Sequence, residues 1–401
     1  MKLGIDRLLQ DPGLQSQLQG KRVALAAHPA SVTSQLEHSM DVLMACSGIE
    51  LCAAFGPQHG LRGEKQDNMV ESQDYRDPIH HIPVYSLYGD VRRPTAQMME
   101  SFDVLLFDIQ DIGCRIYTYA TTLLYLLESC AQHAKSIWIL DRPNPAGRPI
   151  EGSLLQPGWQ SFVGAGEIIM RHGLTLGELA RWFVKYHHLS VDLKVVEMEG
   201  YQINQAPGYG WPLSQLSWVN PSPNASSLNM CRFYAGSVLL EGTTLSEGRG
   251  TTVALEVMGA PDINGKALLT KMTALAPEWL MGASIRPCYF QPTFHKYANQ
   301  LCDGLHVHTD NTNYQHQNFK PFRLVILFLK AIKLHQPDYP LWRDFHYEYE
   351  EERLAFDVIN GGETIREWIE DPVATIEDME KVLRDDEATW RESVASLLCY
   401  K

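Results

Sequence analysis

The sequence predicts an α/β protein whose N-terminal part is a Rossmann-like, doubly wound parallel sheet. Four short segments are almost continuously apolar, as expected of strands that helices cover on both faces. Helical patterns lie between them, over Glu37–Ser47 and Thr118–Ala134. Strands and helices alternating in this way predict a parallel sheet with crossover helices. The four segments are Lys21–Pro29, which runs into a loop, Ile49–Phe55, Ser101–Asp108 and Ser136–Asp141.

The length of 401 residues predicts two domains, because a domain usually has about 100–200 residues. The second half begins with segments rich in glycine and proline, Pro207–Pro212 and Asn220–Asn224, which we expect to form connections around a cleft. The tail Glu348–Lys401 is predicted to be helical and charged, with a turn at Asn360–Gly362, and to close the structure.

The charge composition of the chain argues against some classes of binding partner. The chain has 34 Lys and Arg against 48 Asp and Glu, a formal net charge of −14. This acidity argues against nucleic acid, whose phosphates require a basic surface. An anionic ligand would need a local basic pocket.

The apolar segments do not predict a membrane protein. The most apolar windows, such as Val104–Phe107 and Leu324–Leu329, are far shorter than the roughly 20 residues of a spanning helix. The N-terminus has charges where a signal peptide would be apolar, so we expect a cytosolic protein. The eight cysteines are scattered without a Cys-x-x-Cys pair, which predicts buried, reduced thiols. The oligomeric state is left open.

Polar loops follow all four predicted strands. In open parallel sheets, ligands bind beyond the carboxyl ends of the strands. Each loop alone has a structural explanation, because Gly-Pro segments need particular backbone angles and an Asp at a strand end often caps a helix. Four such loops at one edge favour a ligand site. They are His28–Ser31, Gly56–Gly63, Asp108–Arg115 and Asp141–Pro145.

Two common site motifs are missing. The first strand is not followed by Gly-x-Gly-x-x-Gly, which argues against a dinucleotide, and the chain has no Gly-x-Ser-x-Gly nucleophile elbow. Asp6, near the start, is interpreted as a helix cap. The segment Leu239–Thr252 is dense in acids, threonines and glycines, so we expect a ligand-binding lip there, with a flexible surface loop as the alternative.

The loops, taken in order along the chain, resemble one family, the exo-β-N-acetylmuramidases of the NamZ type, long catalogued as a domain of unknown function. The resemblance extends from Gly4 to Tyr400. Its seven motifs are Phe55–Gly63, Leu87–Gly89, Phe107–Tyr119, Leu140–Pro145, Arg171–Ala180, Asn220–Asn224 and Glu241–Thr251.

The resemblance implies a Rossmann-like domain over residues 1–205, a smaller α/β domain over residues 206–401, and an active-site cleft between them. It implies a glycosidase that releases N-acetylmuramic acid from the non-reducing end of peptidoglycan fragments. The ligand would then be a small anionic saccharide, a muropeptide or a disaccharide that contains N-acetylmuramic acid. Neither a metal nor an organic cofactor is implied, and no membrane partner.

One residue departs from the family pattern. The family loop usually reads Pro-Glu-His-Gly, with the Glu as its favoured catalytic carboxylate, whereas this chain has Gln58. An amide cannot protonate a glycosidic oxygen as a carboxylic acid does. Another acid could take the role, or the chain could be a silent or re-specified sugar-binding homologue, or a hydrolase of another amino sugar or anionic glycoside.

Glycoside cleavage usually requires two carboxyl groups, and a substrate acetamido group can replace one of them. Asp111 is the first choice, with a salt bridge to Arg115 as its structural alternative. Glu178 has capping-box spacing after Thr175, which favours a structural role. The predicted catalytic set is Asp111, Glu241, Glu247, Gln58 and His59, and the further acids considered are Asp108, Asp141, Glu178 and Glu64.

The predicted substrate-binding residues lie in the same loops. A bidentate arginine is the natural partner of the lactyl carboxylate of N-acetylmuramic acid, and an aromatic ring can stack on a sugar face. The spacing of His59 and His172 does not predict a metal site. The predicted binding set is His28, Arg62, Gln110, Arg115, Tyr117, Arg142, Asn144, Asn224 and Arg249.

Overall fold

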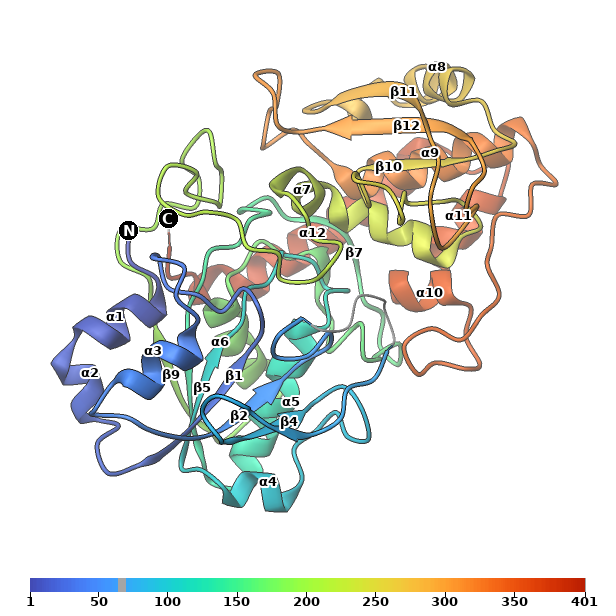
Figure 1. The fold of residues 1–401 in the computed structure, drawn as a ribbon. Helices are drawn as coiled ribbons and strands as arrows, with labels where there is room; N and C mark the ends of the chain where they lie inside the picture. The colour runs from blue at the N-terminus through green and yellow to red at the C-terminus, as the bar shows by residue number, and fades with distance from the viewer. Residues whose placement is uncertain (64–69, 401) are drawn as a thin grey trace.

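A seven-stranded sheet organises the N-terminal part of the chain (Figure 1). The computed structural model describes residues 1–63 and 70–400. The strand order is β3-β4-β2-β1-β5-β6-β9, parallel except for the pairing of β3 with β4. The strands are β1 (Arg22–Ala27), β2 (Glu50–Gly56), β3 (Tyr75–Arg76), β4 (Pro83–Ser86), β5 (Val104–Asp108), β6 (Ser136–Leu140) and β9 (Asp192–Val196). The order reverses between β1 and β5, and in open sheets of this kind ligands bind beyond the carboxyl ends of the strands at such a reversal.

Helices cover both faces of this sheet, which explains the continuous apolar strands. In β5, Val104 and Leu106 pack in one core with α1 and α3, whereas Leu105 and Phe107 pack in the other with α5 and α6. Alternate side chains therefore enter two different cores, and both must be apolar. The helices of this part are α1 (Gly4–Gln10), α2 (Pro12–Ser16), α3 (Ser39–Ala45), α4 (Ala96–Glu100), α5 (Tyr119–Gln132) and α6 (Leu176–Tyr186).

A three-stranded antiparallel sheet in the order β10-β12-β11 forms the centre of the C-terminal part. The helix α9 (Pro321–His335) is almost entirely buried, because it packs against both α7 and α8. The other elements are α7 (Leu228–Ser237), η1 (Val238–Gly242), β10 (Val257–Ala260), α8 (Gly265–Leu275), η2 (Pro277–Leu280), β11 (Ser284–Phe290), β12 (Cys302–His308), α10 (Ala355–Asn360) and α11 (Thr364–Glu370).

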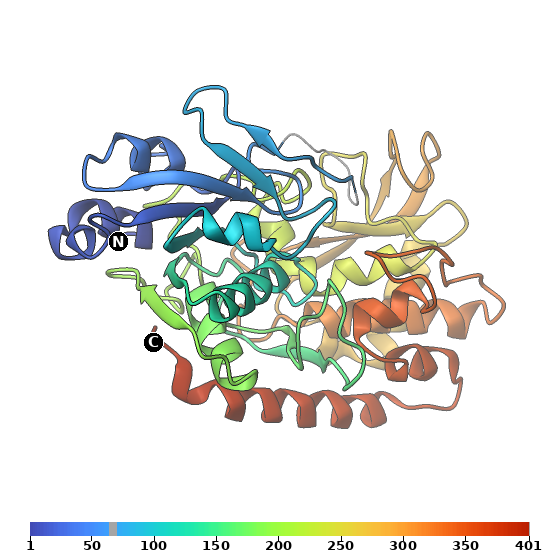
Figure 2. The same cartoon turned by 90° about the horizontal axis from the view of Figure 1, so that it is seen from below.

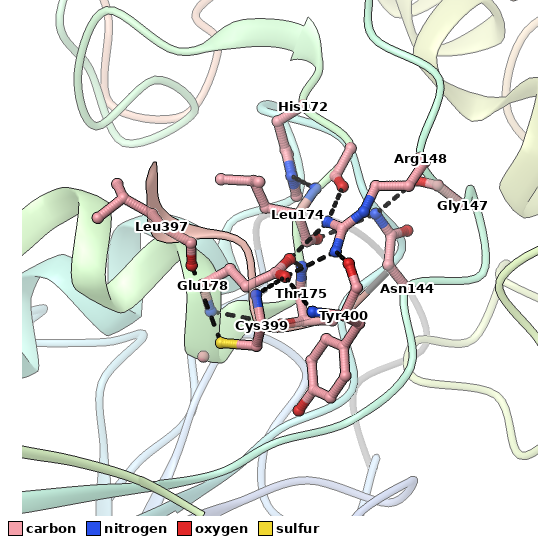
Figure 3. A network of polar contacts seen from close by, with 12 residues as sticks. Asn144, Gly147, Arg148, His172, Leu174, Thr175, Glu178, Leu397, Cys399 and Tyr400 are labelled. Atoms are coloured by element: carbon pink, nitrogen blue, oxygen red, sulfur yellow. Dashed lines mark hydrogen bonds and ion pairs between the residues drawn. The ribbon is translucent and has the colours of Figure 1, made fainter. Parts of the chain in front are cut away.

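The last helix returns to the N-terminal part. The helix α12 (Ile376–Val394), followed by η3 (Ala395–Leu397), runs along the molecule in Figure 2 and packs on the hairpin of β7 (Glu151–Leu154) and β8 (Ile169–Arg171). The chain end then docks on α6, where Glu178 accepts hydrogen bonds from the backbone of Cys399 and Tyr400 (Figure 3). The tail thus closes the structure.

The α/β class, the four strands and the two helices predicted from the sequence are confirmed, with ends that differ by a few residues. Asp6 caps α1 through the amide of Leu3, and Thr175 forms a capping box with Glu178. The prediction that the tail is helical from Glu348 is wrong at its start, because α10 begins only at Ala355. The boundary at residues 205 and 206 stays a prediction. Within residues 1–63 and 70–400, no helix combines the length and the apolar character that a membrane crossing requires.

Candidate active site

A polar cavity lies where the loops after β2 and β5 meet segments of the C-terminal part. It contains about 450 Å³ of space outside the protein atoms, including open solvent at its mouth. The lining residues are Gln58, His59, Ile116, Tyr117, Thr118, Val163, Ser222, Asn224, Met230, Tyr234, Glu241, Arg249, Leu255, Tyr347 and Glu348.

A tight turn after β2 brings Gln58 and His59 to the cavity. The amide of Gly60 donates to the carbonyl of Pro57 at 2.9 Å, and His59 has a φ of 71°. A left-handed conformation is uncommon outside glycine and is often found at functional sites. Gly56 allows the loop to fold back closely, because a Cβ there would lie 2.8 Å from the nitrogen of Leu61.

The amide group of Gln58 is held on both sides. Its Oε1 accepts a hydrogen bond of 2.7 Å from the Thr118 hydroxyl. Its Nε2 donates one of 3.0 Å to Oε1 of Glu348. The residue that stands in place of the family's Glu is therefore hydrogen-bonded to another carboxyl group, which lines the same cavity.

Sequence reasoning missed Glu348, which belongs to a two-residue hairpin turn. Tyr347 and Glu350 exchange two backbone hydrogen bonds, of 3.0 and 3.1 Å. Between them, Glu348 and Tyr349 have φ values of 47° and 72°, the positive values of a type I′ turn, which usually selects Asn or Gly. This turn buries the Glu348 side chain, which is 6% exposed.

The surroundings of Glu348 favour the protonated carboxyl group. Burial raises its pKa to about 7, and the charge of Glu241 acts in the same direction. Hydrogen bonds from Tyr88, at 2.8 Å, and from Gln58 act against this rise. A buried carboxyl that exchanges its proton near neutral pH has the property that general acid catalysis requires.

A second carboxylate in the cavity belongs to a buried ion-pair network. Glu241 lies 2.5 Å from Nη2 of Arg249 and accepts a hydrogen bond of 2.8 Å from Tyr347. Glu247 pairs with Nε of Arg249 at 3.1 Å and with Nζ of Lys296 at 2.7 Å. Although burial alone would raise it, these cations lower the pKa of Glu247 to about 2.

The structure brings six of the fourteen predicted site residues to the cavity. The six residues are Gln58, His59, Tyr117, Asn224, Glu241 and Arg249. Glu247 stands behind Arg249, with its side chain fully buried. The other seven residues lie elsewhere along the carboxyl edge of the sheet.

Asp111, the first choice for a catalytic acid, lies outside the lining of the cavity. Its Oδ2 accepts a hydrogen bond of 2.6 Å from the Gly113 amide and lies 3.5 Å from Nε2 of His172. Its predicted alternative, a salt bridge to Arg115, is wrong. The Arg115 guanidinium donates instead to the backbone carbonyls of Ser153, Ile168, Ile359 and Asn360.

The remaining polar residues of the edge mainly hold the loops together. The ring of His28 contacts the backbone of Gln110 at 3.0 and 3.1 Å, and burial lowers its pKa to about 4. The Gln110 side chain donates to the carbonyls of Asp111 and Pro143, each at 2.7 Å. The loops after β1, β5 and β6 therefore converge, and backbone groups are the main partners of these side chains.

Three more of the predicted binding residues also bind other groups of the protein: Arg142, Asn144 and Arg62. Arg142 forms a bidentate pair with Asp108, at 2.6 and 2.8 Å. Asn144 donates to the carbonyls of Gly147 and Leu174. Arg62 lies 3.0 Å from Oδ2 of Asp77. Glu64 lies outside the described residues.

Comparison with known proteins gives consistent matches along the whole chain. Two family models, described as the N-terminal and C-terminal parts of the exo-beta-N-acetylmuramidase NamZ, match residues 23–229 and 232–400. The chain is 37% identical over 388 residues to the peptidoglycan beta-N-acetylmuramidase NamZ of Bacillus subtilis, covering 96% of this chain and 88% of the relative.

Two solved structures have the same architecture. Both are DUF1343 family proteins from Bacteroides fragilis, and each alignment covers 100% of this chain and 99% of the other. One has a TM-score of 0.85 with 30% identity, and the other has a TM-score of 0.75 with 25% identity.

Proposed function

Because the chain belongs to the exo-beta-N-acetylmuramidase NamZ family, we propose that it is a glycosidase that releases N-acetylmuramic acid from the non-reducing end of peptidoglycan fragments. The observation that carries this proposal is the cavity, which combines two carboxyl groups, Glu241 and Glu348, with the guanidinium of Arg249. Most glycosidases use a pair of carboxyl groups to cleave the glycosidic bond.

The lining of the cavity suits a sugar that carries an acetamido group and a carboxylate. Tyr117 and Tyr234 supply aromatic surface, and Thr118, Ser222 and Asn224 supply groups that form hydrogen bonds. Of the four arginines predicted to bind the lactyl carboxylate, Arg249 is the one that lines the cavity. We assign it the role of placing positive charge at the wall of an otherwise acidic protein.

The test uses para-nitrophenyl N-acetylmuramide and the disaccharide of N-acetylmuramic acid and N-acetylglucosamine, with product release followed by colour and by mass. We expect both substrates to release free N-acetylmuramic acid. The matched control is para-nitrophenyl N-acetylglucosaminide, which lacks the lactyl group and should be cleaved at least tenfold more slowly, because one lost charge-assisted contact is worth about 1.5–3 kcal/mol. Binding of the disaccharide without cleavage would support a silent sugar-binding homologue and overturn the proposal.

We also propose that the enzyme acts in the cytosol, on small fragments recovered from the cell wall. The support is that all eight cysteines are free thiols, as is usual for proteins of the reducing cytosol. Immunodetection of the protein in fractionated cells tests this location, and its recovery in the medium or the envelope fraction would contradict it.

A further inference from the structure

We propose that Glu348 donates the proton to the departing glycosidic oxygen in this chain, and that Gln58 is its positioning residue. This inference rests on the function proposed above. It assigns the acid role to the loop of the C-terminal part, because the loop after β2 holds an amide in this chain.

Glu348 lies between two neighbouring hollows. Its side chain lines the inner cavity and also a neighbouring outer hollow of about 1000 Å³, open solvent included, which Tyr88, Tyr349 and His346 also line. An exo-acting enzyme holds the terminal sugar in an inner pocket while the rest of the saccharide extends outward. The bond to be cleaved then lies between the two spaces, where the Glu348 carboxyl group is.

Two hydrogen bonds hold the Glu348 carboxyl group, one on each oxygen. Gln58 donates to one oxygen at 3.0 Å, and the Tyr88 hydroxyl donates to the other at 2.8 Å. Gln58 is itself fixed by Thr118, so its amide has a defined direction. An amide at this position hydrogen-bonds Glu348 without the repulsion that a second carboxylate would add.

The backbone of the turn that carries Glu348 is in an uncommon conformation. The turn places two consecutive residues other than glycine, Glu348 and Tyr349, at positive φ. Residues other than glycine are strained in this conformation, and such strain concentrates at functional sites. Aromatic contacts hold the turn in place, because the Tyr349 ring packs against the rings of Tyr88 and Phe162. The guanidinium of Arg92 lies over the same ring, with its Cζ 3.8 Å from the ring centroid.

Several ionisable groups around the carboxyl determine when it holds its proton. Burial and Glu241 raise the pKa of Glu348 to about 7, and Tyr88, Gln58 and Arg92 counteract part of that rise. The proton is therefore available below about pH 7 and is lost above it. The other ionisable residues that line the inner cavity or the outer hollow are His59, Glu71, Tyr117, Tyr234, Arg249, His346, Tyr347, Tyr349 and Glu351.

The step balances as an ordinary hydrolysis. Glu348 gives its proton to the glycosidic oxygen as the bond from that oxygen to the anomeric carbon breaks, and the oxygen keeps the electron pair. The rest of the saccharide leaves as an alcohol, and Glu348 becomes a carboxylate. Water supplies a hydroxyl to the anomeric carbon, and its remaining proton restores the acid form of Glu348 through the solvent.

Substrates with different leaving groups test the role. The nitrophenolate departs without protonation, whereas the sugar alcohol of the disaccharide requires it. We expect Glu348→Gln to slow disaccharide cleavage by about 100- to 10,000-fold, the usual contribution of a general acid, and aryl muramide cleavage by less than about tenfold. Glu352→Gln, an exposed residue of the same segment, is the control and should match the natural protein.

The outcomes separate the two proposals. If the natural protein cleaves both substrates and Glu348→Gln slows them equally, or slows neither, Glu348 is not the proton donor and the proposed function stands. If the natural protein cleaves neither substrate, the proposed function fails and the proton-donor role fails with it.

A second variant keeps the test decisive if Glu348→Gln does not fold. Gln58→Leu removes one hydrogen bond that lowers the pKa of Glu348. The basic limb of kcat/KM for the disaccharide should therefore move to higher pH. A basic limb that stays in place would contradict the positioning role.

Discussion

The guanidinium of Arg249 lies 2.5 Å from the carboxylate of Glu241 at the wall of the cavity, and both side chains are more than nine-tenths buried. Glu247 and Lys296 extend this pair into the protein. Lys296 also donates to the backbone carbonyls of Leu240, Thr243 and Leu245, so the charges of the cavity wall are fixed to the backbone of η1 and the loop that follows it.

Replacing Arg249 should therefore lower the free energy of unfolding. Arg249→Gln leaves Glu241 and Glu247 without a shared cation, and breaking a buried pair in this way costs about 3–5 kcal/mol. Urea denaturation measures this loss. The control is Lys2→Gln, whose partner Glu199 is on the surface, and an exposed pair is worth about 0–1 kcal/mol. Equal losses for the two variants would contradict a buried network.

The contact between the chain end and α6 gives a second prediction. Glu178 is fully buried and accepts two hydrogen bonds from Arg148, at 2.6 and 2.7 Å, and two from the backbone of Cys399 and Tyr400, at 2.7 and 3.3 Å (Figure 3). Glu178→Gln should destabilise the protein by about 3–5 kcal/mol, because the Arg148 charge loses its partner.

Hydrogen exchange locates the effect of Glu178→Gln. Amides of the last residues should exchange much faster in the variant. The exchange rates of amides in the central sheet should rise only as far as the loss of global stability requires. Glu199→Gln, in an exposed pair with Lys2, serves as the control. If the exchange rates at the chain end do not change, the contact between the chain end and α6 does not depend on Glu178.

The sequence was sufficient for the central sheet because the physical signal there is local. Ser101–Asp108 and Ser136–Asp141 could be predicted as strands since every residue of a doubly covered strand faces a core. The chain end shows the limit of that signal. The charged sequence after Glu348 resembles a solvated helix, and only tertiary contacts show that residues before Ala355 form a hairpin turn and a connection.

The site was partly predictable for the same reason. The loops after the strands gave Gln58, His59 and Tyr117, and the dense polar segment gave Glu241 and Arg249. Glu348 stands in a run of glutamates, Glu348 and Glu350–Glu352, and nothing in one sequence distinguishes the glutamate that a positive-φ turn directs inward. Conversely, Arg115 and Arg142 have the chemistry of ligand anchors, but their guanidinium groups bind carbonyls and Asp108.

Asp141 should make stability depend on pH in an unusual direction. Burial raises its pKa from 3.8 to about 6, despite hydrogen bonds from Tyr400 and Thr175. The folded protein therefore binds this proton more tightly than the unfolded chain, and this contribution to stability falls as the pH rises from about 4 to about 6. The fall is about 3 kcal/mol, on the order of 1.4 kcal/mol for each pKa unit.

The variant Asp141→Asn isolates this effect. Its free energy of unfolding should lack the fall that Asp141 contributes between about pH 4 and pH 6, so the difference from the natural protein should change with pH and level off above that range. Parallel curves for the two proteins across this range would show that Asp141 has an ordinary pKa in the folded state.

Restoring the family's carboxyl group should create a proton-sharing pair. In Gln58→Glu, the new carboxyl would take the place of an amide whose Nε2 lies 3.0 Å from Oε1 of Glu348. Two carboxyl groups at this distance cannot both ionise easily, so they share a proton, and the pKa for losing that shared proton rises above the ordinary value of a carboxyl group. Raised folded-state pKa values mean that stability falls as the pH rises, and the melting temperature of Gln58→Glu should drop below that of the natural protein increasingly from pH 5 to pH 9. The exposed change Gln19→Glu controls for the added charge. If the difference in melting temperature stays constant across this range, the two side chains do not interact. That result would also contradict the contact on which the proposed role of Gln58 depends.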